Sequence, residues 1–374
     1  MLWDIFCKVI DNFGDIGVCW RLSRDLASRG HEVRLWVDDA SALGWMAPEL
    51  SADGRGASGI TVMPWPTDEA LLPEVVPGDV VIEAFGCNPP ERFVARMQRP
   101  EPPRWVNLEY LSAESYVERS HGLHSPVWSG PGYGLKKRFF YPGFTARTGG
   151  LLRETKLIDE REAWAQDADA RAHWLARLGI EANPNERLIT LFCYAQSPIQ
   201  QLLDALNQSG QPCQVLLTPG HATEQARAWP QPPQSAVRLT TLPALPQPDF
   251  DRLLWCADLN IVRGEDSAVR ALWAAKPHVW QIYRQEDGVH ADKLQAFMDL
   301  WMRDWPHSLR QHTEALWRAF NGLSEPQALG PALAALCSSP EWPAWQSASA
   351  RSSQSLAAQT DLVSQLLEFV TQPG

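Results

Sequence analysis

Residues 2–37 read LWDIFCKVIDNFGDIGVCWRLSRDLASRGHEVRLWV, and this stretch decides the fold. Residues 2–10 form an apolar run that predicts a buried strand, and residues 17–29 have the apolar spacing of a helix. Gly30 is suited to end that helix, and residues 31–37 predict a second strand. A strand, a short loop, a helix and another strand make a βαβ unit, which implies a parallel sheet.

The rest of the chain repeats this alternation. Further strands are predicted at residues 60–65, 79–85, 104–111, 187–195 and 213–220, and residues 258–283 again read strand, loop, helix and strand. The Gly-, Pro- and aromatic-rich stretch 119–150 predicts a long ordered loop. The Ser-rich segment 346–356 predicts a polar hinge before a final helix.

We therefore predict an α/β protein with two facing Rossmann-like domains, because 374 residues exceed the usual size of one core. The first domain covers residues 1–182, including a helical linker at 155–182. It is completed by a C-terminal helix at 356–374 that crosses back to it. The second domain covers residues 183–355.

Composition narrows the function classes. The net charge of −11 argues against a nucleic-acid binder, which usually carries a basic stripe. No stretch approaches the ~20 apolar residues of a membrane span, and the N-terminus lacks the basic region of a signal peptide. Seven scattered cysteines form neither a disulfide framework nor a zinc motif. We expect a cytoplasmic protein with no metal and no cofactor, which acts on neither nucleic acid nor a membrane.

The loop after the first strand carries two carboxylates, Asp11 and Asp15. It lacks the GxGxxG fingerprint, although Gly14 still permits close backbone approach. Two carboxylates repel a phosphate, so the loop suits a cation or a nucleophile that must lose a proton. The alternative is that Asp15 caps the helix and Asp11 is solvated. We also assign Asn12, Phe13 and Gly14 to donor binding.

The sequence IVRGEDSAV gives a second candidate site after a predicted strand. Arg263 ends the strand, Gly264 permits the turn, and Asp266 or Ser267 can open the next helix. The arginine and the helix start together can hold a diphosphate, and Glu265 can accept sugar hydroxyls. The alternative is a capped helix with a surface arginine.

Aromatic residues follow other strands of the second half. Phe192 and Tyr194 end one strand and Phe250 precedes a helix, so these rings can sandwich a flat base or can pack in the core. In the loop after residue 282, His290 and Lys293 can reach a phosphate or lie in a solvated loop.

Five motifs together carry a family resemblance. VIDNFGDIGVCWRLSRDLASRGHEVRLWVDD, VNLEYLSAE, FFYPGFTARTGGLLRE, LNIVRGEDS and QIYRQEDGVH resemble the bacterial protein-arginine rhamnosyltransferases that modify elongation factor P, the EarP family. The resemblance implies a GT-B fold and inverting transfer from dTDP-β-L-rhamnose to one arginine of elongation factor P. It also implies that this α-rhamnosyl arginine helps to relieve ribosome stalling at polyproline.

The resemblance also implies residue roles. It places the two N-terminal aspartates of the family on Asp11 and Asp15. We assign Asp15 as the general base, Asp11 as the group that orients the acceptor, and Glu265 as a third catalytic carboxylate. In the second domain, donor binding is assigned to Phe192, Tyr194, Gln247, Phe250, Arg263, Gly264, Glu265, Asp266 and Ser267.

Two other functions remain open from the residues alone. A GT-B transferase with a lipid or glycan acceptor would be expected to carry a basic or amphipathic patch if it acts at a membrane. A sugar-nucleotide binder without catalysis would not need paired carboxylates in its first loop.

Overall fold

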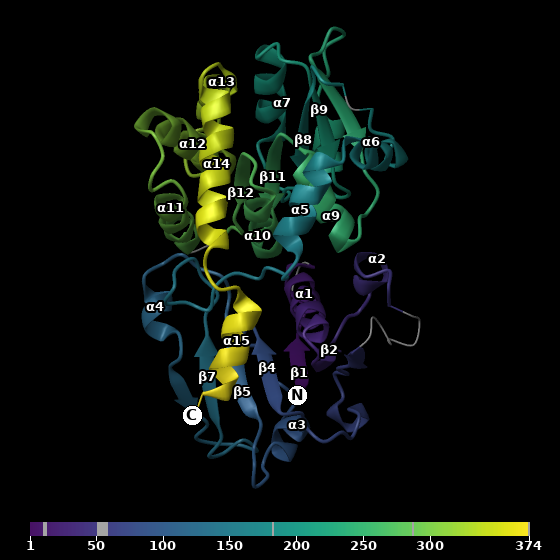
Figure 1. Cartoon of the computed structure of the whole chain (residues 1–374), viewed down its shortest axis with the longest axis vertical. Helices are drawn as coiled ribbons and strands as arrows, with labels where there is room; N and C mark the ends of the chain where they lie inside the picture. Colours follow the sequence, from purple (N-terminus) through teal and green to yellow (C-terminus); the bar gives the residue numbers. More distant parts are fainter. Residues whose placement is uncertain (10–12, 51–58, 182, 286–287, 373–374) are drawn as a thin grey trace. The chain divides into compact units, whose positions relative to one another are not determined.

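The chain folds into two compact units, each with its own parallel sheet (Figure 1). This computed structural model describes residues 1–9, 13–50, 59–181, 183–285 and 288–372. Unit 1 comprises Met1–Thr155 and Gln359–Gly374, and unit 2 comprises Lys156–Ala358.

This division corrects the predicted boundary. The segment 155–182, predicted as part of the N-terminal domain, lies almost entirely in unit 2. Its two helices are short, and the second buries Trp174 and Leu175 against Leu188 and Leu216 of the second sheet. The final helix belongs to unit 1.

Unit 1 is built on a sheet with the strand order β3-β2-β1-β4-β5-β7-β6. All neighbouring strands are parallel except β6 and β7. The strands are β1 Leu2–Cys7, β2 Glu32–Val37, β3 Ile60–Pro64, β4 Val80–Ala84, β5 Arg104–Leu108, β6 His124–Pro126 and β7 Lys136–Phe140. The helices are α1 Gly14–Ser28, α2 Leu43–Met46, η1 Glu69–Leu71, α3 Glu91–Arg96, α4 Tyr116–Ser120 and α15 Leu362–Thr371.

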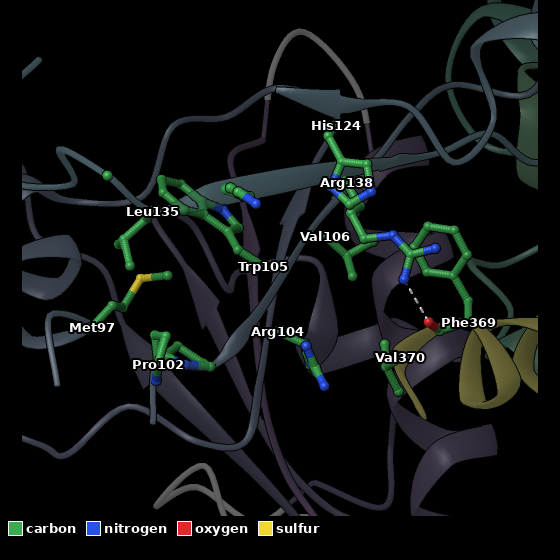
Figure 2. A pocket seen from close by; sticks show the side chains of 13 residues that line it. Met97, Pro102, Arg104, Trp105, Val106, His124, Leu135, Arg138, Phe369 and Val370 are labelled. Carbon is green, nitrogen blue, oxygen red and sulfur yellow. Dashed lines mark hydrogen bonds between the residues drawn. The ribbon is translucent and has the colours of Figure 1, made fainter. Parts of the chain in front are cut away.

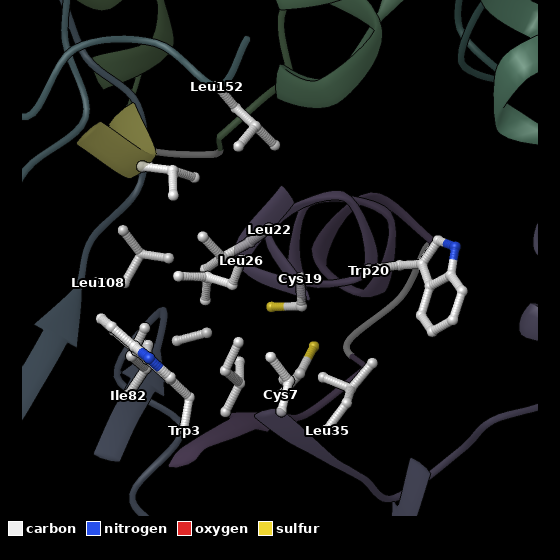
Figure 3. Packing of buried hydrophobic residues seen from close by; sticks show 14 of the residues in the cluster. Trp3, Cys7, Cys19, Trp20, Leu22, Leu26, Leu35, Ile82, Leu108 and Leu152 are labelled. Atoms are coloured by element: carbon white, nitrogen blue, oxygen red, sulfur yellow. The ribbon is translucent and has the colours of Figure 1, made fainter. Parts of the chain in front are cut away.

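Helices α1 and α15 share one face of this sheet (Figure 1). The apolar stripe of α1 packs on β1, β2 and β4, with Leu22 and Leu26 above Trp3 and Ile82 (Figure 3). Asp361 caps α15 and also accepts a hydrogen bond from Arg29 beyond the end of α1 at 2.7 Å. Apolar burial and this ion pair together fix the last helix to unit 1.

The stretch 119–150 is not the long loop that its composition predicted. It contains β6 and β7, which form an antiparallel pair at the edge of the sheet. Two features hide the strand pattern of this hairpin. Turn residues surround it, and β7 is a five-residue run with three cations, KKRFF.

Unit 2 has a second parallel sheet, with the order β10-β9-β8-β11-β12. Its strands are β8 Arg187–Leu191, β9 Cys213–Leu217, β10 Val237–Thr241, β11 Leu259–Arg263 and β12 His278–Gln281. Its helices are α5 Leu157–Gln166, α6 Ala168–Arg177, α7 Ile199–Gln208, α8 His221–Arg227, α9 Gln247–Cys256, α10 Glu265–Ala274, α11 Val289–Trp301, α12 His307–Phe320, η2 Pro326–Ala328, α13 Leu329–Cys337 and α14 Glu341–Ala357.

The Ser-rich segment 346–356 lies inside α14 and is not a hinge. Small residues suit this position because Ala348, Ser349 and Ser353 are buried on the packed side of the helix. In the part of the chain that is described, no helix has both the length and the apolar character needed to cross a bilayer.

Candidate functional site

The predicted donor residues of unit 2 gather where the strand order of its sheet reverses. The loops after β8 and β11 follow neighbouring strands, and Phe192 N–H donates to the Ile261 carbonyl at 2.9 Å. Helices after such strands leave to opposite faces and open a crevice at the carboxyl ends, where α/β sheets bind ligands. The sequence predicted that Phe192, Tyr194 and Arg263 follow strands, and the structure places all three at the topological switch point.

Arg263 is held by two aromatic rings. Its guanidinium carbon lies 4.5 Å from the ring centroid of Phe192 and 4.7 Å from that of Tyr194. Among the described residues it has no carboxylate partner, and burial lowers the pKa of its guanidinium. A half-buried cation without a counter-charge is costly unless a ligand supplies the negative charge. The arrangement is suited to a bound anion.

The position of Tyr194 depends on residues that the sequence did not single out. Its backbone N–H donates to Gln281 Oε1 at 2.8 Å, and its carbonyl accepts from Gln225 Nε2 at 3.0 Å. Ser197 links Tyr194 to the end of β12, because its hydroxyl donates to the Tyr194 carbonyl and lies 3.0 Å from Gln281 Oε1. Tyr283 packs edge-on against the Tyr194 ring. The only local signal for Gln281 was its place at the carboxyl end of a strand.

The start of α10 presents its first turn beside Arg263. Gly264 occupies the N-cap position with φ 70° and ψ −175°, a conformation that is essentially restricted to glycine. A Cβ atom at this position would lie 3.4 Å from the Tyr194 hydroxyl. Asp266 lies in this first turn and Ser267 is buried within it. The glycine thus brings the helix start, Arg263 and Tyr194 close together.

Glu265 already has a cationic partner. Its Oε1 accepts a hydrogen bond from Lys293 Nζ of α11 at 2.8 Å. The pairing gives Lys293 a role other than the phosphate contact considered from sequence. Because Lys293 balances its charge, Glu265 can still accept hydrogen bonds as a neutralised carboxylate. His290 is buried, and its Nδ1 lies 3.3 Å from the Gln285 backbone nitrogen, which donates to it.

The other two predicted donor residues lie on α9. Phe250 packs edge-on against Phe192 with centroids 6.0 Å apart, and it also contacts the core around Leu253. Gln247 is buried in the first turn of α9. Phe250 therefore supports Phe192 from the core, which confirms the packing interpretation of this ring; its contact with a base stays a prediction.

The predicted carboxylate site of unit 1 follows β1, beside the switch between β1 and β4. Helix α1 begins at Gly14, three residues earlier than predicted, so Asp15 lies in its first turn. The N-cap residue is Phe13, which makes no side-chain capping bond, and Asp15 is therefore not the N-cap. A helix start favours the ionised form of a carboxylate, as a base requires. Asp11 and Asn12 lie outside the described residues.

Phe13 is 46% exposed and its ring lies edge-on to Trp45, with centroids 5.9 Å apart. Below the loop, the Cys19 thiol has a raised pKa, mainly because of its hydrogen bond to Cys7, then burial, with a smaller contribution from the charge of Asp15. Asp15 itself is half-buried.

Two further residues mark the carboxyl edge of this sheet. Phe85 directly follows β4, and its ring stacks on Tyr110 with centroids 4.5 Å apart. Its φ of 56° is a strained backbone conformation of the kind that accumulates at functional sites. Glu109 follows β5, accepts a hydrogen bond from Asn107 at 2.8 Å, and has a pKa raised by burial. Sequence patterns gave no separate signal for either. The described residues contain no group of three or more His, Cys, Asp or Glu side chains that could hold a metal ion.

Comparisons with known proteins show the family of this chain. A family model described as elongation factor P (EF-P) rhamnosyltransferase EarP matches residues 3–371. A protein-arginine rhamnosyltransferase of Pseudomonas putida is 43% identical over 380 residues, which cover 98% of both chains.

Solved structures are also similar. One, described as the structural basis for EarP-mediated arginine glycosylation of translation elongation factor EF-P, matches with 31% identity and a TM-score of 0.68, over 99% of this chain and 98% of that one. The spinosyn rhamnosyltransferase SpnG complexed with thymidine diphosphate is 14% identical, with a TM-score of 0.53 over 99% and 100% of the two chains. The predicted α/β GT-B fold is confirmed.

Proposed function

Because this chain belongs to the EarP family of elongation factor P rhamnosyltransferases, we propose that it transfers L-rhamnose from dTDP-β-L-rhamnose to one arginine of elongation factor P. The reaction inverts the anomeric carbon and produces an α-rhamnosyl arginine, which activates the factor to relieve polyproline stalling. We place this activity in the cytoplasm. Unit 1 supplies the base and binds the acceptor, and unit 2 binds the donor.

The observation that carries the donor half of the proposal is the environment of Arg263. It lies against two aromatic rings beside the start of α10, without a carboxylate partner among the described residues. A nucleoside diphosphate matches these features. Its flat base can stack on aromatic rings, and its diphosphate can bind to the arginine and to the helix start. Arg263 and the α10 N-terminus then stabilise the charge that develops on the departing diphosphate.

The acceptor half rests on Asp15. A guanidinium is a poor nucleophile because its charge is delocalised and its pKa lies above ~12. A carboxylate can bind the guanidinium fork and accept a proton from it. Asp15 lies half-buried at the start of α1, where its ionised form is favoured. Asp11, which lies outside the described residues, is assigned to orienting the same guanidinium.

The step is a single in-line displacement. A guanidinium nitrogen attacks C1 of rhamnose, and the C1–oxygen bond to the diphosphate breaks with its electron pair retained on the phosphate oxygen. The proton lost by the attacking nitrogen passes to a carboxylate oxygen of Asp15. Attack from the face opposite the leaving group converts the β-donor into an α-product.

Glu265 has a supporting role in this scheme. Its pairing with Lys293 supports a function as an acceptor for sugar hydroxyls. The positive groups of unit 2 fill the role that a divalent cation has in other transferases, so we propose that neither a metal nor a cofactor is needed.

The experiment is a donor-turnover assay with purified elongation factor P. We expect dTDP release only when both the donor and the acceptor protein are present, at a rate unchanged by EDTA. An acceptor variant with lysine in place of the arginine that is modified should give none. Turnover with a lipid or glycan in place of the protein, or donor binding without any turnover, would refute the proposal.

A further inference from the structure

Unit 1 contains a cavity that the proposed reaction does not use. It has a volume of about 310 Å³ and lies at the amino ends of β5 and β7, beside the last turn of α15 (Figure 2). Arg104 and Lys136 begin the two strands, and Phe369 and Val370 come from the helix. Asp15 follows the carboxyl end of the parallel strand β1, so the cavity lies at the opposite edge of the same sheet.

The lining of this cavity offers hydrogen-bond donors and positive charge. It contains no Asp or Glu. Trp105 is 6% exposed, and its indole Nε1 is buried without a hydrogen-bond partner, as is Nε of Arg138. Arg138 also donates to the Phe369 carbonyl at 2.9 Å (Figure 2). Arg104 and Lys136 are exposed, and neither has an ion-pair partner among the described residues.

These groups favour an anionic occupant. Burial and the nearby charge of Arg104 lower the pKa of Arg138. An anion between the two arginines would relieve this repulsion. The apolar side chains of the lining, such as Leu135 and Val106, would surround the short stem of a carboxylate side chain.

The loop beside the cavity has the character of a protein interface. Gly134 and Leu135 line the cavity, and the same loop carries Trp128 and Tyr133, which are 78% and 66% exposed. Backbone hydrogen bonds hold this loop closed: Val127 N–H donates to Leu135 at 2.9 Å, and Gly134 N–H donates to Val127 at 3.0 Å. Exposed aromatic side chains on a rigid loop, with arginine beside them, are typical anchors of protein–protein contacts.

Charge defines the partner further. Residues 119–153 contain six Lys or Arg and no Asp or Glu, in a chain whose net charge is −11. Within this segment, Lys137 and Arg147 are paired with Glu83 and Glu118, but the cavity lining has Arg104, Lys136 and Arg138 and no acidic side chain. Such a lining on an acidic protein is complementary to an acidic partner. A second copy of this chain, docked through the same surface, would oppose cation to cation.

We propose that this cavity and the loop 127–135 form a docking surface for the protein acceptor, one of whose acidic side chains enters the cavity. This inference rests on the proposed function, which requires unit 1 to hold a protein. A five-residue strand spans roughly 17 Å. An acceptor domain of about 30 Å can therefore contact this surface while its arginine reaches the other edge of the sheet.

The test is calorimetric binding of elongation factor P in the absence of donor. The variant Arg104→Glu with Lys136→Glu reverses two exposed charges, and we expect about tenfold weaker binding or more. The acceptor KM should rise to match, while kcat at saturating acceptor and the affinity for dTDP stay unchanged. Trp128→Ser, a second and independent change in the loop, should also weaken acceptor binding.

The matched control is Arg177→Glu with Arg227→Glu, which makes the same change of charge on exposed helices of unit 2. It should leave the acceptor affinity unchanged. The inference is overturned if the control weakens acceptor binding as much as the cavity variant does. It is also overturned if the cavity variant binds the acceptor with normal affinity, and binding of inorganic phosphate in the cavity would not rescue it. It is equally overturned if the acceptor does not bind the wild-type protein. Normal binding without rhamnose transfer would instead refute the proposed function.

Discussion

Two arginines near the start of α10 make a sharp comparison, because one has a buried carboxylate partner and the other does not. Arg270 is 2% exposed and forms a two-pronged ion pair with Asp251, at 2.6 and 2.9 Å. Arg263 contacts two rings and, among the described residues, no carboxylate. Methionine at either position keeps most of the apolar stem and removes the charge.

The two substitutions should differ in their effect on the free energy of unfolding. Arg270→Met leaves the charge of Asp251 buried, which costs about 3–5 kcal/mol of unfolding free energy. Arg263→Met loses cation–π contacts of about 0.5–1 kcal/mol each but also removes the cost of burying the guanidinium. We therefore expect its stability to stay within about 1 kcal/mol of the wild type.

For donor affinity we expect the reverse, with the larger effect at Arg263. A charge-assisted hydrogen bond is worth about 1.5–3 kcal/mol, so Arg263→Met should weaken dTDP binding roughly 10- to 100-fold. Urea denaturation gives the stabilities, and calorimetry with dTDP gives the affinities. The reasoning would be refuted if Arg263→Met bound dTDP normally, or if it destabilised the protein as much as Arg270→Met does.

Three further outcomes follow from particular contacts. Gly264→Ala should cost about 1–3 kcal/mol of stability and weaken dTDP binding, because its φ of 70° strains a residue with a Cβ atom at the start of α10; equal dTDP affinity would contradict this. Burial lowers the pKa of His278 to about 4 in the folded state against 6.5 unfolded, so the unfolded state binds the proton first as pH falls. The contribution of neutral His278 to the free energy of unfolding is fully present above pH 6.5 and should fall by about 3 kcal/mol towards pH 4. In urea denaturation at several pH values, His278→Phe should lose less stability over this range than the wild type. Leu366→Ala, in the α15 core of unit 1, should cost about 2–5 kcal/mol in urea denaturation and leave dTDP affinity unchanged.

Local patterns were sufficient for most strands of the two sheets and for the loops that follow them, but β6, β7 and β10 lie outside every predicted strand. The apolar run before Asp11 and the one before Arg263 each lead through a glycine into a helix. A parallel sheet places the ends of such strands at one edge. This rule placed Phe192, Tyr194 and Arg263 each after a strand, and the family resemblance assigned them to one donor site.

Contacts between distant segments could not be predicted in this way. Lys293 pairs with Glu265 across 28 positions, and Gln281 fixes a loop 87 positions earlier. The helix that contains Trp174 is polar overall, and its burial depends on a sheet formed later in the chain. Such pairings arise from packing, which the spacing of residues along the chain does not specify.

The most direct test is tandem mass spectrometry of elongation factor P after incubation with dTDP-β-L-rhamnose. With the wild-type protein, we predict one deoxyhexose on one arginine. With Asp15→Asn at saturating donor, we predict none, although dTDP binds with unchanged affinity. A sugar on a residue other than arginine, or modification by Asp15→Asn to the wild-type extent, would contradict the account.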